Sequence, residues 1–183
     1  ISKYKPTSVF EIGGGHGRLA REYQEYDQID WTILEPNPTP VENSNAKYIE
    51  GFFDSNYEYH DSLDTIVHAH VFEHVYNQDV FMRDLSNFLI NGKKLIFALP
   101  NMQTMLEKKY TNCLNFEHTV LITEPYIEFI LSKYGFSIIE KEYFLEAHSI
   151  FYACEKNDQT RKIELKDNLY ALNKKLYLDF VTY

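Results

Sequence analysis

The chain has 183 residues, of which 44% are hydrophobic, and this length and composition suit one globular domain with a core of its own. The formal net charge is −9 and no cluster of Lys and Arg occurs, so a nucleic-acid substrate is disfavoured and a small molecule is the expected partner. No stretch approaches the roughly 20 apolar residues of a membrane span, and Cys113 and Cys154 lack the spacing of a disulfide framework, so we expect a cytoplasmic protein with reduced thiols and no membrane partner.

Strands and helices are expected to alternate through the first half of the chain. Runs of β-branched and aromatic residues predict strands, and apolar residues at helical spacing predict helices. The expected strands are 8–12, 31–34, 47–49, 64–69 and 94–99, and the expected helices are 18–26 and 78–89. Such alternation is typical of a mainly parallel sheet wound on both faces, which binds ligands beyond the carboxyl ends of its strands.

The second half is expected to close the sheet with a hairpin. Thr123 is a suitable N-cap for a helix through Tyr134, and strands over 136–144 and 149–154 are close enough to pair antiparallel. Apolar residues beyond Asn157 lie roughly in helical register and indicate either a packed terminal helix or a homodimer contact: Ile163, Leu165, Leu169, Leu172 and Leu176. We therefore expect a ligand-binding domain over 1–156 and a helical extension of the same domain over 157–183.

A glycine-rich turn follows the first strand. Four of the seven glycines, Gly13, Gly14, Gly15 and Gly17, fall between positions 13 and 17, and glycine lets a backbone approach a ligand closely. Arg18 stands where a dinucleotide-binding turn has its third glycine, and no Lys-Ser or Lys-Thr pair follows as in a phosphate-binding loop. Glu11 precedes the turn, where its charge would repel a pyrophosphate and favour an ammonium or sulfonium group.

A second acidic residue lies about 20 residues beyond the turn. Glu35 ends the second predicted strand and is followed by Pro36, which stops regular structure. At this distance from the turn, a carboxylate can accept hydrogen bonds from the hydroxyls of a ribose. Together, the turn and Glu35 indicate a cofactor that carries a ribose and a positive charge.

These residues resemble the motifs of class I (Rossmann-like) S-adenosylmethionine-dependent methyltransferases. The resemblance extends over roughly residues 6 to 155, and its further segments are 49–53, 64–67, 71–75, 91–95 and the pair Pro100-Asn101. It implies a three-layer α/β/α, doubly wound fold with a mostly parallel seven-stranded sheet and an antiparallel C-terminal strand. It also implies S-adenosylmethionine as cofactor and S-adenosylhomocysteine as product. Relatives usually place a helix or more before the first strand.

The resemblance also assigns cofactor-binding roles. It implies that the glycine turn, preceded by Glu11, approaches the amino-acid end of the cofactor, and that Glu35 with Pro36 contacts the ribose. Gly51, Phe52 and Phe53 would lie by the adenine, although Phe52 stands where many relatives have an Asp. Ala69 and His70 would line the methionine part.

The acceptor side is expected in the loop around His118. This loop resembles that of methyltransferases acting on sugars and other small metabolites, some of which use a histidine there as base, and Glu117 is suited to orient the imidazole. His74 and His70 are alternatives for a cleft-facing histidine, and His68 is expected to be a hydrogen-bonded core residue. The spacing of His68 and His70 suits a metal, but no cluster of Cys or carboxylates completes a ligand set, so no metal is expected.

The predicted function is therefore transfer of a methyl group from S-adenosylmethionine to a small metabolite, such as a sugar or a sugar nucleotide, with O-methylation favoured. Two alternatives stay open. One is an NAD-dependent oxidoreductase or epimerase on a related fold, and the other is a methyltransferase-like domain that binds without catalysis. A binding test with NAD and with S-adenosylmethionine distinguishes the first alternative from the predicted function. An assay of methyl transfer distinguishes the second.

Overall fold

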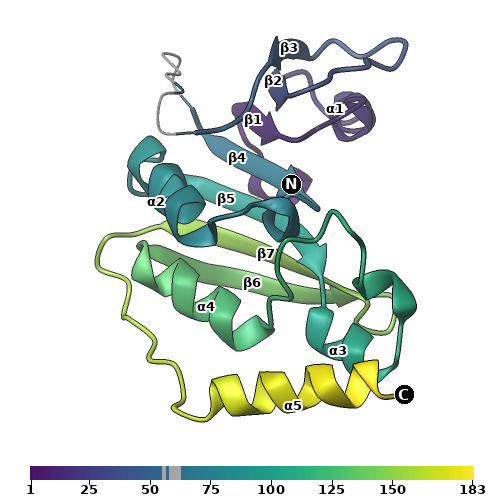
Figure 1. Cartoon of the computed structure of the whole chain (residues 1–183). Coiled ribbons are helices and arrows are strands. Elements are labelled where there is room, and N and C mark those ends of the chain that lie inside the picture. Colours follow the sequence, from purple (N-terminus) through teal and green to yellow (C-terminus); the bar gives the residue numbers. More distant parts are fainter. Residues whose placement is uncertain (55–56, 58–62) are drawn as a thin grey trace.

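The computed structural model describes residues 1–54, 57 and 63–183. Seven strands form one sheet in the order β3-β2-β1-β4-β5-β7-β6. The strands are β1 Ser8–Ile12, β2 Asp30–Glu35, β3 Lys47–Glu50, β4 Thr65–Ala69, β5 Lys94–Pro100, β6 Phe136–Phe144 and β7 Ser149–Lys156. The first five pair in parallel, and β7 runs antiparallel to both β5 and β6. The predicted mostly parallel sheet with an antiparallel C-terminal strand is thus confirmed (Figure 1).

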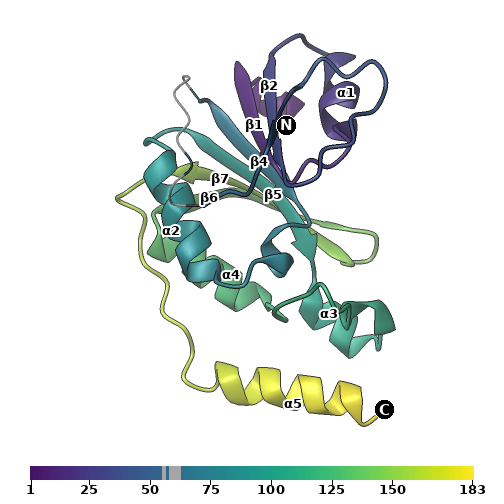
Figure 2. The same cartoon turned by 45° about the horizontal axis from the view of Figure 1, so that its top comes forward.

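Helices cover both faces of this sheet, as the alternation predicted. They are α1 Arg18–Gln24, α2 Gln78–Phe88, α3 Met102–Glu107, α4 Glu124–Lys133 and α5 Leu169–Val181, with short 3₁₀ helices η1 Ser2–Tyr4, η2 Phe72–His74 and η3 Thr111–Cys113. Helix α1 packs beside β1 and β2, while α2 and α4 cover the other face (Figures 1 and 2).

The alternation of side chains along β1 explains the two layers of core. Phe10 and Ile12 point into the larger core beneath α2 and α4, whereas Val9 packs with Trp31 and Ile33 on the α1 side. A strand buried on both faces needs apolar residues at neighbouring positions, and Val9, Phe10 and Ile12 supply them, which made residues 8–12 recognisable as a strand.

Helix α3 was not expected from the sequence. It starts directly after β5, where the Asn101 side chain accepts a hydrogen bond from the backbone N–H of Thr104 (3.2 Å). Its buried residues Met102, Met105 and Leu106 form a small core of their own. A helix of six residues spans too few turns to give a recognisable period.

The C-terminal segment is helical over a shorter range than its apolar pattern suggested. Ile163 and Leu165 lie in an irregular connection, and α5 begins only at Leu169. Leu176 and Phe180 of α5 pack against the core of α3. Within residues 1–54, 57 and 63–183, no helix combines the length and hydropathy that crossing a bilayer requires.

Candidate active site

The parallel strands end together at one edge of the sheet, and the order of strands reverses between β1 and β4. The loop after β1 and the loop after β4 leave this point in opposite directions, which opens a crevice beyond the strand ends. The predicted glycine turn, Glu35 and His70 all follow strands at this edge.

The loop after β1 is shaped by glycines at positive φ. Gly13 has φ +71°, and a Cβ there would lie 2.5 Å from Cγ2 of Val71, so the backbone approach leaves no room for a side chain. Gly15 also has positive φ (+53°), but a Cβ on it would meet no atom within 4 Å. Gly13 therefore serves the packing of the loop, whereas Gly15 borders open space.

Glu35 is held against this loop by two backbone hydrogen bonds. Its Oε2 accepts from the N–H of Gly15 (3.0 Å), and its Oε1 accepts from the N–H of Asn37 (3.1 Å). The side chain is half-buried at the end of β2. Since each carboxylate oxygen has two lone pairs, both oxygens retain capacity for the hydroxyls of a ribose.

Two adjoining cavities lie beside the glycine loop and Glu35. The inner cavity has a volume of about 360 Å³, within the range of small-molecule sites. It is lined by Ile12, Gly13, Leu34, Pro36, Gly51, Phe52, Phe53, His70, Val71, His74, Val75, Tyr76 and Phe81. The outer cavity, of about 590 Å³, is lined by Glu35, Pro36, His74, Tyr76, Phe116, Glu117 and Thr119. Three residues line both, so the cavities form one cleft.

Most of the predicted cofactor-binding residues meet in this cleft. Those that line the inner cavity are Gly13, Pro36, Gly51, Phe52, Phe53 and His70, and Glu35 borders the outer one. Those that line neither cavity are Glu11, Gly14, Gly15, Gly17 and Ala69. Their direct contact with a cofactor stays a prediction.

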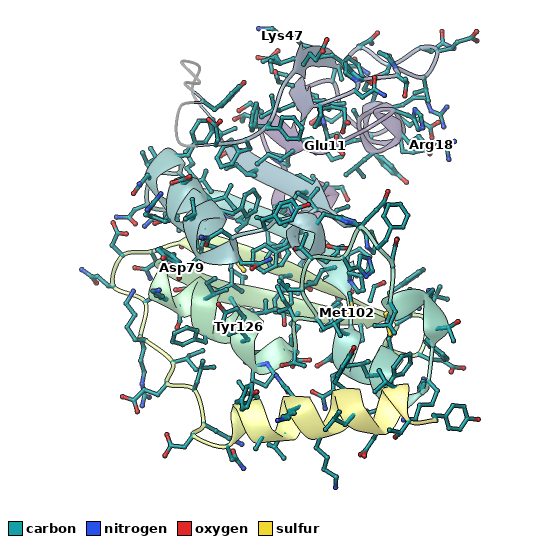
Figure 3. All side chains as sticks on the ribbon, in the orientation of Figure 1. Glu11, Arg18, Lys47, Asp79, Met102 and Tyr126 are labelled. Atoms are coloured by element: carbon teal, nitrogen blue, oxygen red, sulfur yellow. The ribbon has the colours of Figure 1, made fainter. Side chains whose placement is uncertain are left out.

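Glu11 lies beneath the glycine loop, on the α1 side of the sheet (Figure 3). Its side chain is 4% exposed, and its Oε2 accepts a hydrogen bond from Trp31 Nε1 (2.8 Å). Burial raises the pKa of the Glu11 carboxyl to about 7, although the Trp31 hydrogen bond favours the ionised form. A Cβ on Gly14 would lie 2.7 Å from Cδ of Glu11, so this carboxyl group supports the loop from below.

Buried Glu73 organises the histidines at the end of β4. Its side chain is 2% exposed, and its Oε1 lies 3.2 Å from Nδ1 of His70, which adopts a positive φ of 56° and lines the inner cavity. The hydrogen bond to Glu73 raises the pKa of His70. Oε2 of Glu73 is buried without a hydrogen-bond partner among the residues that the structure describes.

The predicted base His118 lies behind His74 rather than directly on the cleft. His118 is half-buried, lines neither cavity, and its Nδ1 is 3.0 Å from the carbonyl oxygen of Cys113. Its ring centroid lies 5.2 Å from that of His74, which lines both cavities. Nδ1 of His74 lies 2.9 Å from the backbone carbonyl oxygen of Glu117. Glu117 itself lines the outer cavity. Of the three histidines that the sequence offered as a base, His70 and His74 thus line the cleft and His118 lies behind His74, and the catalytic roles of His118 and Glu117 stay predictions.

His68 is buried as expected, but it is not hydrogen-bonded. Neither ring nitrogen has a partner among the described residues, and the ring stacks on Phe97 at a centroid distance of 4.8 Å. Burial lowers the pKa of His68 to about 3, so it is a neutral aromatic side chain of the core.

Sequence reasoning missed the aromatic rim of the outer cavity. Tyr76 and Phe116 are 92% and 95% exposed, and both line this cavity together with Thr119. A signal was present, because exposed aromatic side chains in polar loops after β4 and α3 have no role in the core.

Comparison with known proteins identifies the class of this protein. A family described as "Methyltransferase domain" matches residues 2–141. The chain therefore belongs to this methyltransferase family, and it is a class I, S-adenosylmethionine-dependent methyltransferase. No curated protein matches the chain at the level of sequence.

Solved structures show the same fold at low sequence identity. The PH0226 protein of Pyrococcus horikoshii superposes with a TM-score of 0.66 at 13% identity, covering 84% of each chain. An S-adenosylmethionine-dependent methyltransferase from Mesorhizobium loti gives a TM-score of 0.64 at 14% identity, covering 81% of this chain and 90% of that one. The magnesium protoporphyrin IX methyltransferase of Synechocystis, solved with S-adenosylhomocysteine, gives 0.63 at 15% identity, covering 81% and 74%.

Proposed function

We propose that the inner cavity holds S-adenosylmethionine and that the outer cavity admits a small hydroxyl-bearing metabolite, which the protein methylates on oxygen. The observation that carries this proposal is the 3.0 Å hydrogen bond between the Gly15 N–H and the Glu35 carboxylate. It joins the two cofactor motifs at the mouth of one cleft.

In this proposal the cofactor lies along the strand ends. Its ribose hydroxyls donate to Glu35 beside Pro36, and its adenine packs between Gly51, Phe52 and Phe53. Phe52 is 75% exposed without a ligand, so covering an adenine would bury it and offset the missing Asp contact. The methionine part then extends past the glycine loop, from Gly13 to Gly17, toward Ala69 and His70. Glu11 contributes indirectly, because its carboxyl group supports the glycine loop from below.

The lining of the outer cavity supports an uncharged acceptor. Glu35 and Glu117 border it, and no Lys or Arg lines either cavity among the described residues. A sugar nucleotide brings a diphosphate that these carboxylates would repel, whereas a neutral sugar offers hydroxyls to them and a face to Tyr76 and Phe116. We therefore favour a neutral sugar or similar metabolite over a sugar nucleotide. The free thiols of Cys113 and Cys154 support a cytoplasmic location.

Methyl transfer requires an aligned acceptor oxygen and a group that takes its proton. The acceptor oxygen attacks the methyl carbon in line as the carbon–sulfur bond breaks, so alignment and exclusion of water supply much of the rate. We propose that Nε2 of His118 takes this proton and that Glu117 assists by holding His74 beside it through its backbone carbonyl. The Cys113 carbonyl accepts only from a protonated Nδ1, which leaves Nε2 of a neutral His118 as the basic nitrogen.

Calorimetry and a methyl-transfer assay test this function together. Glu35→Ala should weaken binding of S-adenosylhomocysteine by about 10- to 100-fold, because two ribose hydrogen bonds to a charged acceptor are lost. Glu42→Ala, at an exposed position, is the matched control. Transfer to neutral sugars should exceed transfer to sugar nucleotides. His118→Ala should lower kcat by about 10²- to 10⁴-fold, whereas His148→Ala, at a residue that lines neither cavity, should not. Unchanged cofactor affinity in Glu35→Ala would contradict the proposed site.

A further inference from the structure

Three potential metal ligands meet at the boundary of the outer cavity. One carboxylate oxygen of Glu73 and one ring nitrogen each of His74 and His118 all lie within 4.8 Å of one another. Glu73 and His74 belong to η2, directly after β4, and His118 belongs to the loop before α4. The Thr119 N–H and hydroxyl both bond the carbonyl of Glu73 (3.0 and 3.2 Å), which holds the two segments together.

Both histidines have the tautomer that a metal ligand needs. Nδ1 of His74 lies 2.9 Å from the Glu117 carbonyl oxygen, and Nδ1 of His118 lies 3.0 Å from the Cys113 carbonyl oxygen. A carbonyl only accepts, so each Nδ1 carries its hydrogen and each neutral ring keeps its lone pair on Nε2. An imidazole whose other nitrogen donates to a backbone carbonyl is the usual arrangement around a metal ion.

Glu73 is a buried carboxyl group that pairs only with histidines among the described residues. Its side chain is 2% exposed, its Oε2 has no partner among the described residues, and its ion-pair distances there are to His70 (3.2 Å) and His74 Nε2 (3.9 Å). No Lys or Arg within residues 1–54, 57 and 63–183 pairs with it. A buried carboxylate requires a cation or several hydrogen bonds, and a divalent ion satisfies this requirement.

We propose that Glu73, His74 and His118 bind a divalent transition-metal ion of the zinc, manganese or ferrous class. Two imidazoles and one carboxylate suit these ions and leave coordination positions open for a further ligand. Metal bonds of about 2.0–2.2 Å put neighbouring ligands roughly 3–3.5 Å apart, so the side chains close by roughly an ångström on binding. From the sequence we expected no metal, because the ligands of this site come from separate segments and the visible His-x-His pair contains neither His74 nor His118.

The site deepens the proposed function and rests on it for its role. Of the three ligands, His74 lines both cavities, so an acceptor in the outer cavity would reach the ion beside the His74 ring. A hydroxyl bound to the ion has a lowered pKa and loses its proton to water, after which its oxygen takes the methyl group as the carbon–sulfur bond breaks. The products are a methyl ether, S-adenosylhomocysteine and one proton. The ion then replaces a free His118 as the means of deprotonation, and it selects an acceptor with two adjacent oxygens, such as a vicinal diol.

Titration of tag-free, chelator-treated protein with Co²⁺ tests the site without any assay of activity. The wild type should bind one equivalent, with visible d–d absorption that zinc abolishes by displacement. His118→Ala and Glu73→Gln should each weaken binding by about 100-fold or more, whereas His148→Ala, which removes a histidine elsewhere, should bind as the wild type does. Glu73→Gln keeps the shape of the side chain, so it stays informative if His118→Ala fails to fold.

Binding of S-adenosylhomocysteine, measured in the same samples, separates the two proposals. Cofactor binding without stoichiometric Co²⁺ binding overturns the metal site and leaves the cofactor site intact. Co²⁺ binding that depends on Glu73 and His118 without cofactor binding supports the metal site and contradicts the proposed cofactor site. One equivalent of Co²⁺ that both variants retain also overturns the assignment, since the ion is then held elsewhere.

Discussion

At the scale of single residues, burial of the Glu11 carboxyl group disfavours its charged form. Its carboxyl group is buried beneath the glycine loop with one hydrogen-bond donor, Trp31. Such a group remains protonated to higher pH in the folded state than in the unfolded chain. The acidic residue that marks the cofactor motif in the sequence is therefore, in the fold, a group that titrates near neutral pH.

This titration predicts a pH-dependent stability. The pKa of Glu11 rises from 4.5 to about 7 on folding, so the folded state binds the proton more tightly, and this contribution is lost as the pH rises from about 4.5 through 7. The wild type should lose up to about 3 kcal/mol of unfolding free energy between pH 5 and pH 8 relative to Glu11→Gln, which accepts from Trp31 without titrating. Urea denaturation of both proteins at the two pH values measures this difference. Parallel pH profiles would contradict it.

Alanine substitutions at two glycines of the loop should differ in their effects on stability and cofactor affinity. Gly13→Ala should destabilise the fold by about 3 kcal/mol or more, because its Cβ would clash with Val71 at positive φ. Gly15→Ala should cost only about 1–2 kcal/mol, since no atom lies within 4 Å of a Cβ there. Gly15 lines neither cavity, but the resemblance to methyltransferases implies that the cofactor reaches this backbone, and in that case the added methyl group should weaken cofactor binding. Thermal unfolding measures the loss of stability in each variant, and calorimetry measures the change in its affinity for the cofactor. Equal cofactor affinity in Gly15→Ala and the wild type would mean that the cofactor does not approach this backbone.

At the scale of elements, helix α5 has two unlike faces. Leu176 and Phe180 pack against the core around α3, which fits the interpretation of a packed terminal helix. The opposite face carries Leu178, which is 45% exposed, whereas Leu172 lies one turn before Leu176 on the packed side. The predicted homodimer contact included Leu172 and Leu176, but Leu176 packs within the chain, so a dimer through α5 would use the face of Leu178 instead.

Substitutions on the two faces should differ in effect. Phe180→Ala should lower the unfolding free energy by about 1–3 kcal/mol through lost packing, whereas Leu178→Glu should change it by no more than about 0.5 kcal/mol in the monomer. If α5 forms the homodimer, Leu178→Glu should instead convert a dimer into a monomer. Denaturation combined with sedimentation velocity measures both effects. A wild type that sediments as a monomer at all concentrations would remove the dimer prediction.

At the scale of the whole molecule, the sheet order brings the ends of β1, β2, β3 and β4 to one edge, and the residues that line the inner cavity come from the ends of these strands, from the segments that follow them and from α2. A ligand that bridges these segments binds the folded state alone. Its binding energy therefore adds directly to the stability of the fold.

S-adenosylhomocysteine should accordingly stabilise the protein as a whole. At about 100 times its Kd it should add about 2.7 kcal/mol to the unfolding free energy, which corresponds to a rise in Tm of roughly 5–10 °C for a domain of this size. NAD at the same concentration should produce no shift. Differential scanning fluorimetry measures both, and a shift with NAD alone would contradict the family assignment of the cofactor.

The sequence by itself determined the fold class, the glycine loop and Glu35, because strand periodicity, glycine spacing and a carboxylate at a strand end are local properties of the chain. It located the strands to within about two residues, and its expectation that the loop of His118 forms the acceptor side stays a prediction. It did not determine the short helix α3, whose single capped segment has too few turns to show a period.

Only the tertiary structure decided which polar groups face one another. Glu11 turns toward Trp31 on the neighbouring strand, and His74 lies between the cleft and His118, which comes from a loop far along the chain. Glu73 is likewise buried by the segments that pack around η2, and its Oε2 has no hydrogen-bond partner among the described residues. Such distances and burial arise from segments remote in the sequence, so no local pattern encodes them, and the candidate metal ligands became visible only when the fold assembled them.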